Sequence, residues 1–195
     1  MTTQRAWVLL PSGNRLSILA PDPRAWTDRD LAIGLSRTYR WSGYSAWDHP
    51  LSVAQHSLTV LELRQHAAKR RLTPLKPHLG DGYQRLVALH QTAVDIRYGL
   101  PAWDEDAYRA HKAADHLAAA SEAFHVVGWS RASIRDDLRI TIEPVAEDPL
   151  ADTVGFAPWE PWPASYAAER FLDALLLLTS DMAGISDLAR NAELA

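Results

Sequence analysis

An arginine–tryptophan pair, Arg40-Trp41, stands a short distance before a segment that carries a histidine, His56. The guanidinium group of arginine presents a planar fork of donors that matches the oxygens of a phosphate. The indole of tryptophan offers a flat face on which a base or a sugar can stack, and a neutral imidazole can ligate a metal ion. These residue types predict binding of a nucleotide or another phosphate-containing small molecule, with Arg40 on the phosphate and Trp41 on the base.

Two more side chains, His90 and Asp115, are of types that can bind a divalent cation, an imidazole and a carboxylate. Such a cation can activate water against a phosphoryl group. The alternative for each residue is structural. A histidine on an apolar face can be a hydrogen-bonded core residue, and a buried carboxylate must be paired. The partner of Asp115 would then be Arg40 or a histidine, and His111, four residues earlier, is one candidate.

Composition excludes several other classes of function. The chain has no cysteine, which rules out disulfides, thiolate metal sites and cysteine nucleophiles. It also has no Gly-rich phosphate loop, no Gly-x-Ser-x-Gly elbow and no His-Glu-x-x-His run. The net charge of −4 argues against non-specific binding to nucleic acid. Because no signal-peptide pattern and no apolar run of membrane-spanning length occur, we expect a cytoplasmic protein without a membrane segment.

The length of 195 residues and the hydrophobic content of 47% predict a single folded domain over residues 1–195. Residues 1–26 should form a β-hairpin, with strands over 6–10 and 15–19, and a connection. Residues 27–138 should form a helical core, and residues 139–195 an irregular connection and a last helix. Helical spacing and end signals place the helices at about residues 28–38, 52–70, 82–98, 104–127, 130–138 and 164–183.

The helix faces give two further expectations. His56 shares one face of its helix with Val60 and Leu63, and His90 lies on the inner stripe of the next helix, so both histidines should point inward. The last helix carries leucines at all of 175–178, which cover most of its circumference. Either the bundle surrounds this helix or a second subunit covers its far side. We expect a homodimer in which it forms part of the contact, with Trp159 or Trp162 nearby.

The order of these motifs resembles that of the HD-domain phosphohydrolases, in particular the bacterial branch that acts on nucleotides. The resemblance covers about residues 7–127 and implies an all-α, HD-like helical bundle with a small N-terminal β-hairpin. The similar pieces are the hairpin with Trp7, Ser12-Gly13 and Arg15, the run Asp30-Leu31-Ala32, Arg40-Trp41-Ser42-Gly43, Ser52 to Leu58 with His56 as the metal ligand, and Lys112 to Asp115 followed by Glu122.

The His-Asp dipeptide of that family is absent from this chain. In one account, His90 keeps the histidine, and Gln91, Val94 and Gly99 replace the aspartate, the glutamate and the later aspartate of the family. The Leu100-Pro101 ending fits this account, which we prefer. In the other account, the helix with the dipeptide has been deleted near residues 69–71.

The first account has a chemical consequence. Gln91 offers only a neutral amide oxygen, and Val94 cannot take up a proton. A site of His56, His90 and Asp115 would then be vestigial and without metal, whereas a divalent metal would be its cofactor if the site still works.

Three functions follow: a degenerate HD-family nucleotide-binding protein with weak or absent phosphohydrolase activity, an active metal-dependent nucleotide phosphohydrolase that uses His56, His90 and Asp115, or a dimeric interaction protein without catalysis. Arg40 exposed in a cleft would favour the first two, and Arg40 paired with Asp115 would favour the third.

Overall fold

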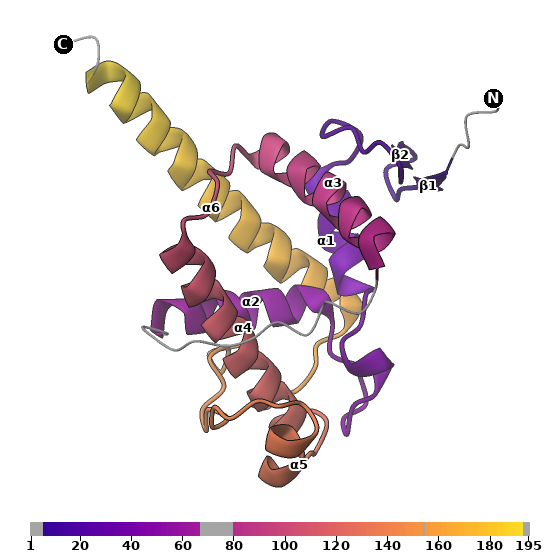
Figure 1. The fold of residues 1–195 in the computed structure, drawn as a ribbon, viewed down its shortest axis with the longest axis vertical. Helices are drawn as coiled ribbons and strands as arrows, with labels where there is room; N and C mark the ends of the chain where they lie inside the picture. The colour runs from indigo at the N-terminus through magenta and orange to yellow at the C-terminus, as the bar shows by residue number, and fades with distance from the viewer. Residues whose placement is uncertain (1–5, 67–79, 154, 193–195) are drawn as a thin grey trace.

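The computed structural model describes residues 6–66, 80–153 and 155–192. This part of the chain is mostly helical, with a small two-stranded hairpin at its N-terminal end (Figure 1), so the predicted fold class is confirmed at that level. The elements are β1 (Trp7–Leu9), β2 (Arg15–Ser17), α1 (Asp28–Ser36), the 3₁₀ turn η1 (Trp41–Gly43), α2 (Val53–His66), α3 (Gly80–Tyr98), α4 (Glu105–His125), α5 (Arg131–Asp136) and α6 (Ala164–Ala192).

The hairpin pairs β1 with β2 in antiparallel register, with Val8 opposite Leu16. Its turn is closed by a 2.9 Å hydrogen bond from the Gly13 amide to the Leu10 carbonyl. Gly13 has φ +86°, a conformation that glycine adopts at little cost. A two-stranded ribbon of this size needs support from another element. Helix α1 gives that support, because the Ser12 amide donates to Asp30 Oδ1 at 2.8 Å.

Asp30 joins the hairpin to the N-terminus of α1. The Thr27 hydroxyl accepts from the Asp30 amide, and Asp30 Oδ2 accepts from the Thr27 amide at 2.8 Å, which is a capping box. Only 5% of Asp30 is exposed. Burial opposes ionisation of this carboxyl, but the hydrogen bonds from Thr27 and Ser12 outweigh it and lower its pKa.

The helices form the core through small and branched side chains. Helix α6 packs against α1 and α2, and α2 packs against α4. On α2, Val60 and Leu63 meet the fully buried Ala114 and Ala118 of α4, and such small residues let two helices approach closely. His56 is buried on the same side of α2 as Val60 and Leu63, as the helical spacing predicts.

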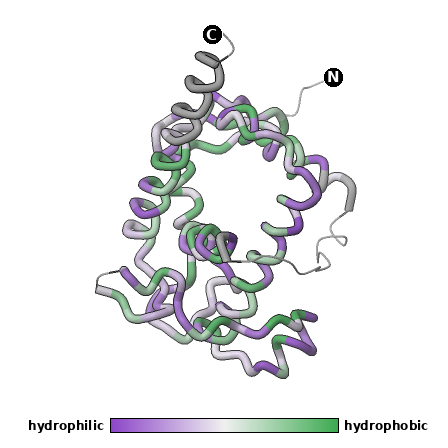
Figure 2. Tube along the Cα trace, turned by 90° about the vertical axis from the view of Figure 1, so that its left-hand side faces the viewer, coloured by the Kyte–Doolittle hydropathy of each residue, from purple (hydrophilic) through white to green (hydrophobic). Residues whose placement is uncertain are grey.

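Hydrophobic and hydrophilic residues follow one another along the coloured parts of the helices in Figure 2. Within the described residues, no helix has both the length and the apolar character required to cross a membrane.

Three expectations differ from the structure. Helix α6 continues through Gly184 to Ala192 instead of ending near residue 183, since a single glycine inside a helix costs only about 1 kcal/mol. Leu89 of the predicted inner stripe on α3 is 49% exposed. Trp159 and Trp162 are 6% and 3% exposed, so they belong to the core and are not available to an interface. Residues 67–70 of the predicted second helix lie outside the described residues.

Replacing Asp30 should measure how strongly the hairpin and α1 depend on this carboxylate. We expect Asp30→Asn to lower the free energy of unfolding by about 1.5–3 kcal/mol, because hydrogen bonds to a charged acceptor are lost. Urea denaturation at neutral pH measures the difference. Since the folded pKa of Asp30 is lowered, its stabilisation is present above the ordinary pKa and is lost as the pH falls through the folded value. A difference between the two proteins that grows on acidification would contradict this account.

Candidate functional site

Three segments that are far apart in the sequence converge on one buried carboxylate, that of Glu122. Arg40 and Trp41 come from the turn before α2, His56 comes from α2, and Glu122 lies near the end of α4. Glu122 also stands seven residues after Asp115, which places both side chains on one face of α4 two turns apart. We call Arg40, Trp41, His56, Asp115 and Glu122 the charged cluster.

Both oxygens of Glu122 are occupied. Oε2 accepts from Arg40 Nε at 3.1 Å and from Trp41 Nε1 at 3.3 Å, and Arg40 Nη2 lies 3.1 Å from the same oxygen. Oε1 lies 2.5 Å from His56 Nδ1. The side chain of Glu122 is only 2% exposed. A carboxylate this deeply buried requires such partners, since an unpaired charge would be costly there.

His56 bridges Glu122 and a second carboxylate. Its other ring nitrogen, Nε2, lies 3.3 Å from Asp115 Oδ1, and Lys112 Nζ lies 3.5 Å from Asp115 Oδ2. Carboxylates only accept, so both bonds to His56 are made fully by the doubly protonated imidazolium.

The electrostatics favour this charged form. Burial alone would lower the pKa of His56, but the negative charge of Glu122 and the hydrogen bonds to Asp115 and Glu122 outweigh it and raise the pKa. The bond to His56 likewise holds the pKa of Asp115 far below its ordinary value, against the opposing effect of burial and with help from Lys112 and Arg40.

The turn that carries Arg40 and Trp41 has an uncommon backbone. Trp41, Ser42 and Gly43 have φ values of 53°, 55° and 79°, all in the left-handed region. For the two residues with a Cβ this conformation costs roughly 1–2 kcal/mol each. The flanking residues hold the turn in place, because the Arg40 amide donates to the Leu51 carbonyl at 2.8 Å and Tyr39 bridges to Ser52. The strained turn therefore places the guanidinium of Arg40 and the indole of Trp41 beside Glu122.

The outer side of the cluster is open to solvent. The side chains of Arg40, Lys112 and Asp115 are 27%, 25% and 28% exposed. Further out, Trp103 is 45% exposed, and the guanidinium of Arg64 lies 5.2 Å from the centre of its ring. A charged ligand could therefore reach the guanidinium of Arg40 and the ammonium group of Lys112 more readily than the buried side chains of His56 and Glu122.

His90 and Gln91 lie elsewhere. His90 Nε2 is 2.9 Å from the Ile18 carbonyl beside the hairpin, and Gln91 Nε2 donates to Asp95 Oδ1 on the same helix at 2.8 Å. Neither residue has a hydrogen bond to the charged cluster, so the structure brings together Arg40, Trp41, His56 and Asp115 but not His90.

Across residues 6–66, 80–153 and 155–192, no group of three or more histidine, aspartate or glutamate side chains is placed to hold a metal ion. The two nitrogens of His56 face opposite directions, each toward a carboxylate, so one metal ion could not replace both contacts. His90 lies beside the hairpin and not beside His56, so replacement at His90-Gln91 stays a prediction that rests on the Leu100-Pro101 ending. The rival deletion near residues 69–71 lies outside the described residues.

Sequence reasoning gave Glu122 no chemical role, although it is the centre of the cluster. The sequence feature that could have identified Glu122 is its position seven residues after Asp115 on an alanine-rich helix. An acidic residue on the buried face of such a helix must have a partner there. Lys112 lies three residues before Asp115 on the same helix, and this spacing likewise indicates an ion pair, which Lys112 makes with Asp115 Oδ2.

Comparison with known proteins adds one relative. An uncharacterized protein from Rhodobacter capsulatus is 35% identical over 151 residues, which cover 66% of this chain and 77% of that protein. The chain belongs to the same family as that protein. No protein-family model matches the chain.

The raised pKa of His56 predicts how stability changes with pH. A folded pKa above the unfolded value gives stabilisation that is complete below the unfolded value of about 6.5 and is lost as the pH rises through the folded value. We therefore expect the free energy of unfolding to fall as the pH rises above about 6.5 and through the folded pKa of His56, and this slope to be absent in His56→Gln. Urea denaturation at several pH values measures both. A slope of the same size in wild type and variant would assign the pH dependence to other groups.

Proposed function

We propose that this protein is a degenerate member of the HD-domain phosphohydrolases that binds a nucleotide and has weak or absent metal-dependent phosphohydrolase activity. The observation that carries the proposal is the meeting of Arg40, Trp41, His56 and Asp115, which the resemblance to that family singles out, in one partly open cluster. The helical architecture with an N-terminal hairpin is compatible with an HD-like bundle.

The cluster has donors available for a phosphate. Glu122 occupies Nε and Nη2 of Arg40, and the described residues give no hydrogen bond to Nη1. Lys112 adds a second, partly exposed cation to the cluster, with its Nζ 3.5 Å from Asp115 Oδ2. An anion bound there would receive charge-assisted hydrogen bonds, which are the stronger class.

The same geometry opposes hydrolysis. A metal ligand must be a neutral imidazole, but the two carboxylates beside His56 favour its charged form and raise its pKa. His90 donates to a backbone carbonyl beside the hairpin and does not join Asp115. The alternative, an active phosphohydrolase using His56, His90 and Asp115, would require both histidines to leave these partners.

Nucleotide binding can be tested at Arg40. We expect calorimetry on the full chain with a panel of nucleoside monophosphates to find a ligand whose affinity falls by about 1.5–3 kcal/mol in Arg40→Ala, the range for a hydrogen bond to a charged group. Arg135→Ala is the matched control, because the Arg135 side chain is 60% exposed and pairs with its neighbour Asp136 on α5. Arg40→Lys keeps the positive charge but lacks the planar guanidinium group. It therefore shows how much of the lost affinity comes from the geometry of that group.

Two outcomes would overturn the proposal. If no nucleotide binds, or if the affinity is the same in Arg40→Ala and Arg135→Ala, the cluster is not a phosphate site.

A phosphate-release assay with Mg²⁺, Mn²⁺ or Co²⁺ distinguishes the degenerate nucleotide-binding protein from the active phosphohydrolase. Turnover in the usual range of about 1–10³ s⁻¹ that disappears in His56→Ala would establish the active phosphohydrolase instead.

The exposed side of α6 supports the third function, a dimeric interaction protein. Leu176, Leu177 and Leu178 are 47%, 65% and 46% exposed, so the first part of α6 is covered by α1 and α2 while three consecutive leucines remain uncovered in the single chain. Such a surface is typical of a contact with another protein.

We therefore expect a homodimer, with a mass twice that of the 21.7 kDa chain by light scattering at micromolar concentration. Leu177→Glu should shift the protein to a single-chain mass, because a charge at the contact would lose its water. Leu19→Glu is the control, since Leu19 is 50% exposed and lies beside the hairpin. A single-chain mass for the wild type would exclude the dimer.

A further inference from the structure

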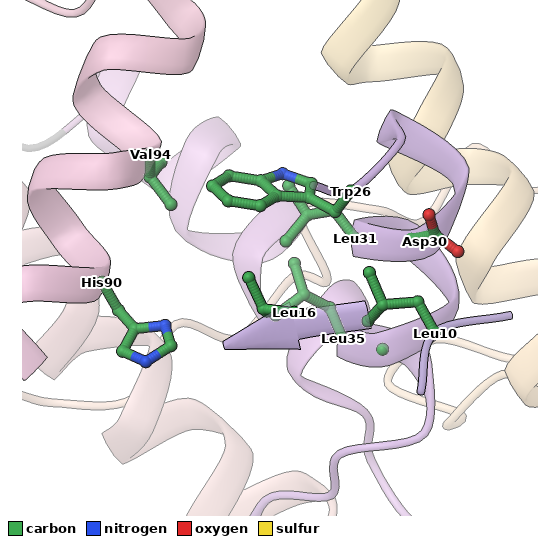
Figure 3. A pocket seen from close by; sticks show the side chains of 9 residues that line it. Leu10, Leu16, Trp26, Asp30, Leu31, Leu35, His90 and Val94 are labelled. Carbon is green, nitrogen blue, oxygen red and sulfur yellow. The ribbon is translucent and has the colours of Figure 1, made fainter. Parts of the chain in front are cut away.

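A second potential site lies between the hairpin, α1 and α3. It is a cavity of about 200 Å³, and none of its lining residues belongs to the charged cluster. In Figure 3, Val94 and His90 reach toward it from α3 and face Trp26, Leu16, Leu31 and Leu35. The wall is almost entirely apolar. For comparison, an apolar cavity of about 150 Å³ can hold a benzene molecule, so this one has room for a slightly larger ring system.

His90 supplies a polar group to this wall. Its Nε2 lies 2.9 Å from the Ile18 carbonyl, which can only accept, so Nε2 carries the hydrogen. In a neutral imidazole the other nitrogen, Nδ1, is then a bare acceptor, and Figure 3 shows the ring turned toward Leu16 and the cavity. The carboxylate of Asp30 is already occupied by Thr27 and Ser12. His90 therefore offers a ligand one acceptor, and the buried Nε1 of Trp26 has no hydrogen-bond partner among the described residues.

Gly34 is the position at which the wall of the cavity can be changed most simply. It lies inside α1, where glycine is less stable than alanine. It also lines the cavity, and a Cβ added at this position would meet no atom within 4 Å. Gly34 is exposed, so it lies at the open rim of the cavity, and a larger side chain there can occupy part of the space.

We propose that this cavity binds one aromatic molecule of one or two rings that carries a single O–H or N–H donor, as in phenols and indoles. The donor bonds to His90 Nδ1, and the ring packs against Trp26 and the leucine side chains. The proposal does not depend on nucleotide binding, because the two sites share no residue.

Indole and p-cresol are the probes, with toluene as an analogue of the same size without a donor. Saturable binding to the full chain, followed by calorimetry or by NMR, is expected with a dissociation constant on the order of 1 mM or lower. Gly34→Leu should weaken binding of both probes at least about 10-fold by filling the cavity, and Gly34→Ala should weaken it less. Gly82→Leu is the matched control, since Gly82 is exposed on α3 and its Cβ would also meet nothing.

His90→Leu tests the hydrogen bond. It should weaken indole and p-cresol by about 2- to 13-fold, the range for one neutral hydrogen bond, and leave toluene unchanged. Thermal unfolding confirms that the variants fold, and both substitutions at Gly34 should raise the midpoint, by about 2–4 °C for alanine. The proposal is overturned if no probe binds saturably, if folded Gly34→Leu binds like Gly82→Leu, or if toluene binds wild type as tightly as p-cresol.

Discussion

The buried carboxylate of Glu122 is the constraint on which the rest of the charged cluster depends. A negative charge with 2% side-chain exposure is stable only if charged or hydrogen-bonding partners surround it. Arg40, Trp41 and His56 supply these partners from two other segments. This requirement explains why Trp41 and Ser42 accept a left-handed backbone and why a histidine occupies the inner face of α2.

The charges around Glu122 do not cancel. Two carboxylates, Glu122 and Asp115, face three cationic groups, those of Arg40, His56 and Lys112. The excess positive charge lies on the open side, where Arg40 and Lys112 are about one-quarter exposed. Such an arrangement attracts an anion, although the chain as a whole has a net charge of −4. Local charge, and not the overall balance, therefore supports a phosphate-containing ligand.

Much of the fold could be predicted from local sequence signals. The hairpin turn, the cap at Thr27 and the glycine after α3 all act over a few residues, and each lies where the sequence indicates. Helical spacing also showed that His56 points inward. The same spacing could not show which part of the core an inward residue meets, and for that reason His90 was assigned to the metal set although it lies beside Ile18.

Residues distant in sequence were harder to predict for the same reason. Arg40 and Glu122 are 82 residues apart in the sequence, and no periodic pattern in the sequence indicates that they are in contact. Trp159 was expected near an interface because its environment was unknown, but it packs in the core, where its ring stacks on His125 at 4.6 Å. The end of α6 was misplaced because a glycine stops a helix only where a turn follows it.

The protonation state of His56 tests the central claim directly, because the account requires a charged imidazole that bridges Glu122 and Asp115. Nitrogen-15 NMR of the imidazole, followed as the pH rises above the ordinary histidine pKa of about 6.5, distinguishes a doubly protonated ring from a neutral one. The account predicts that both nitrogens of His56 carry hydrogen and that the resonances revert to those of a neutral ring in Glu122→Gln. A neutral His56 in the wild-type protein, with one bare nitrogen available to a metal ion, would contradict it.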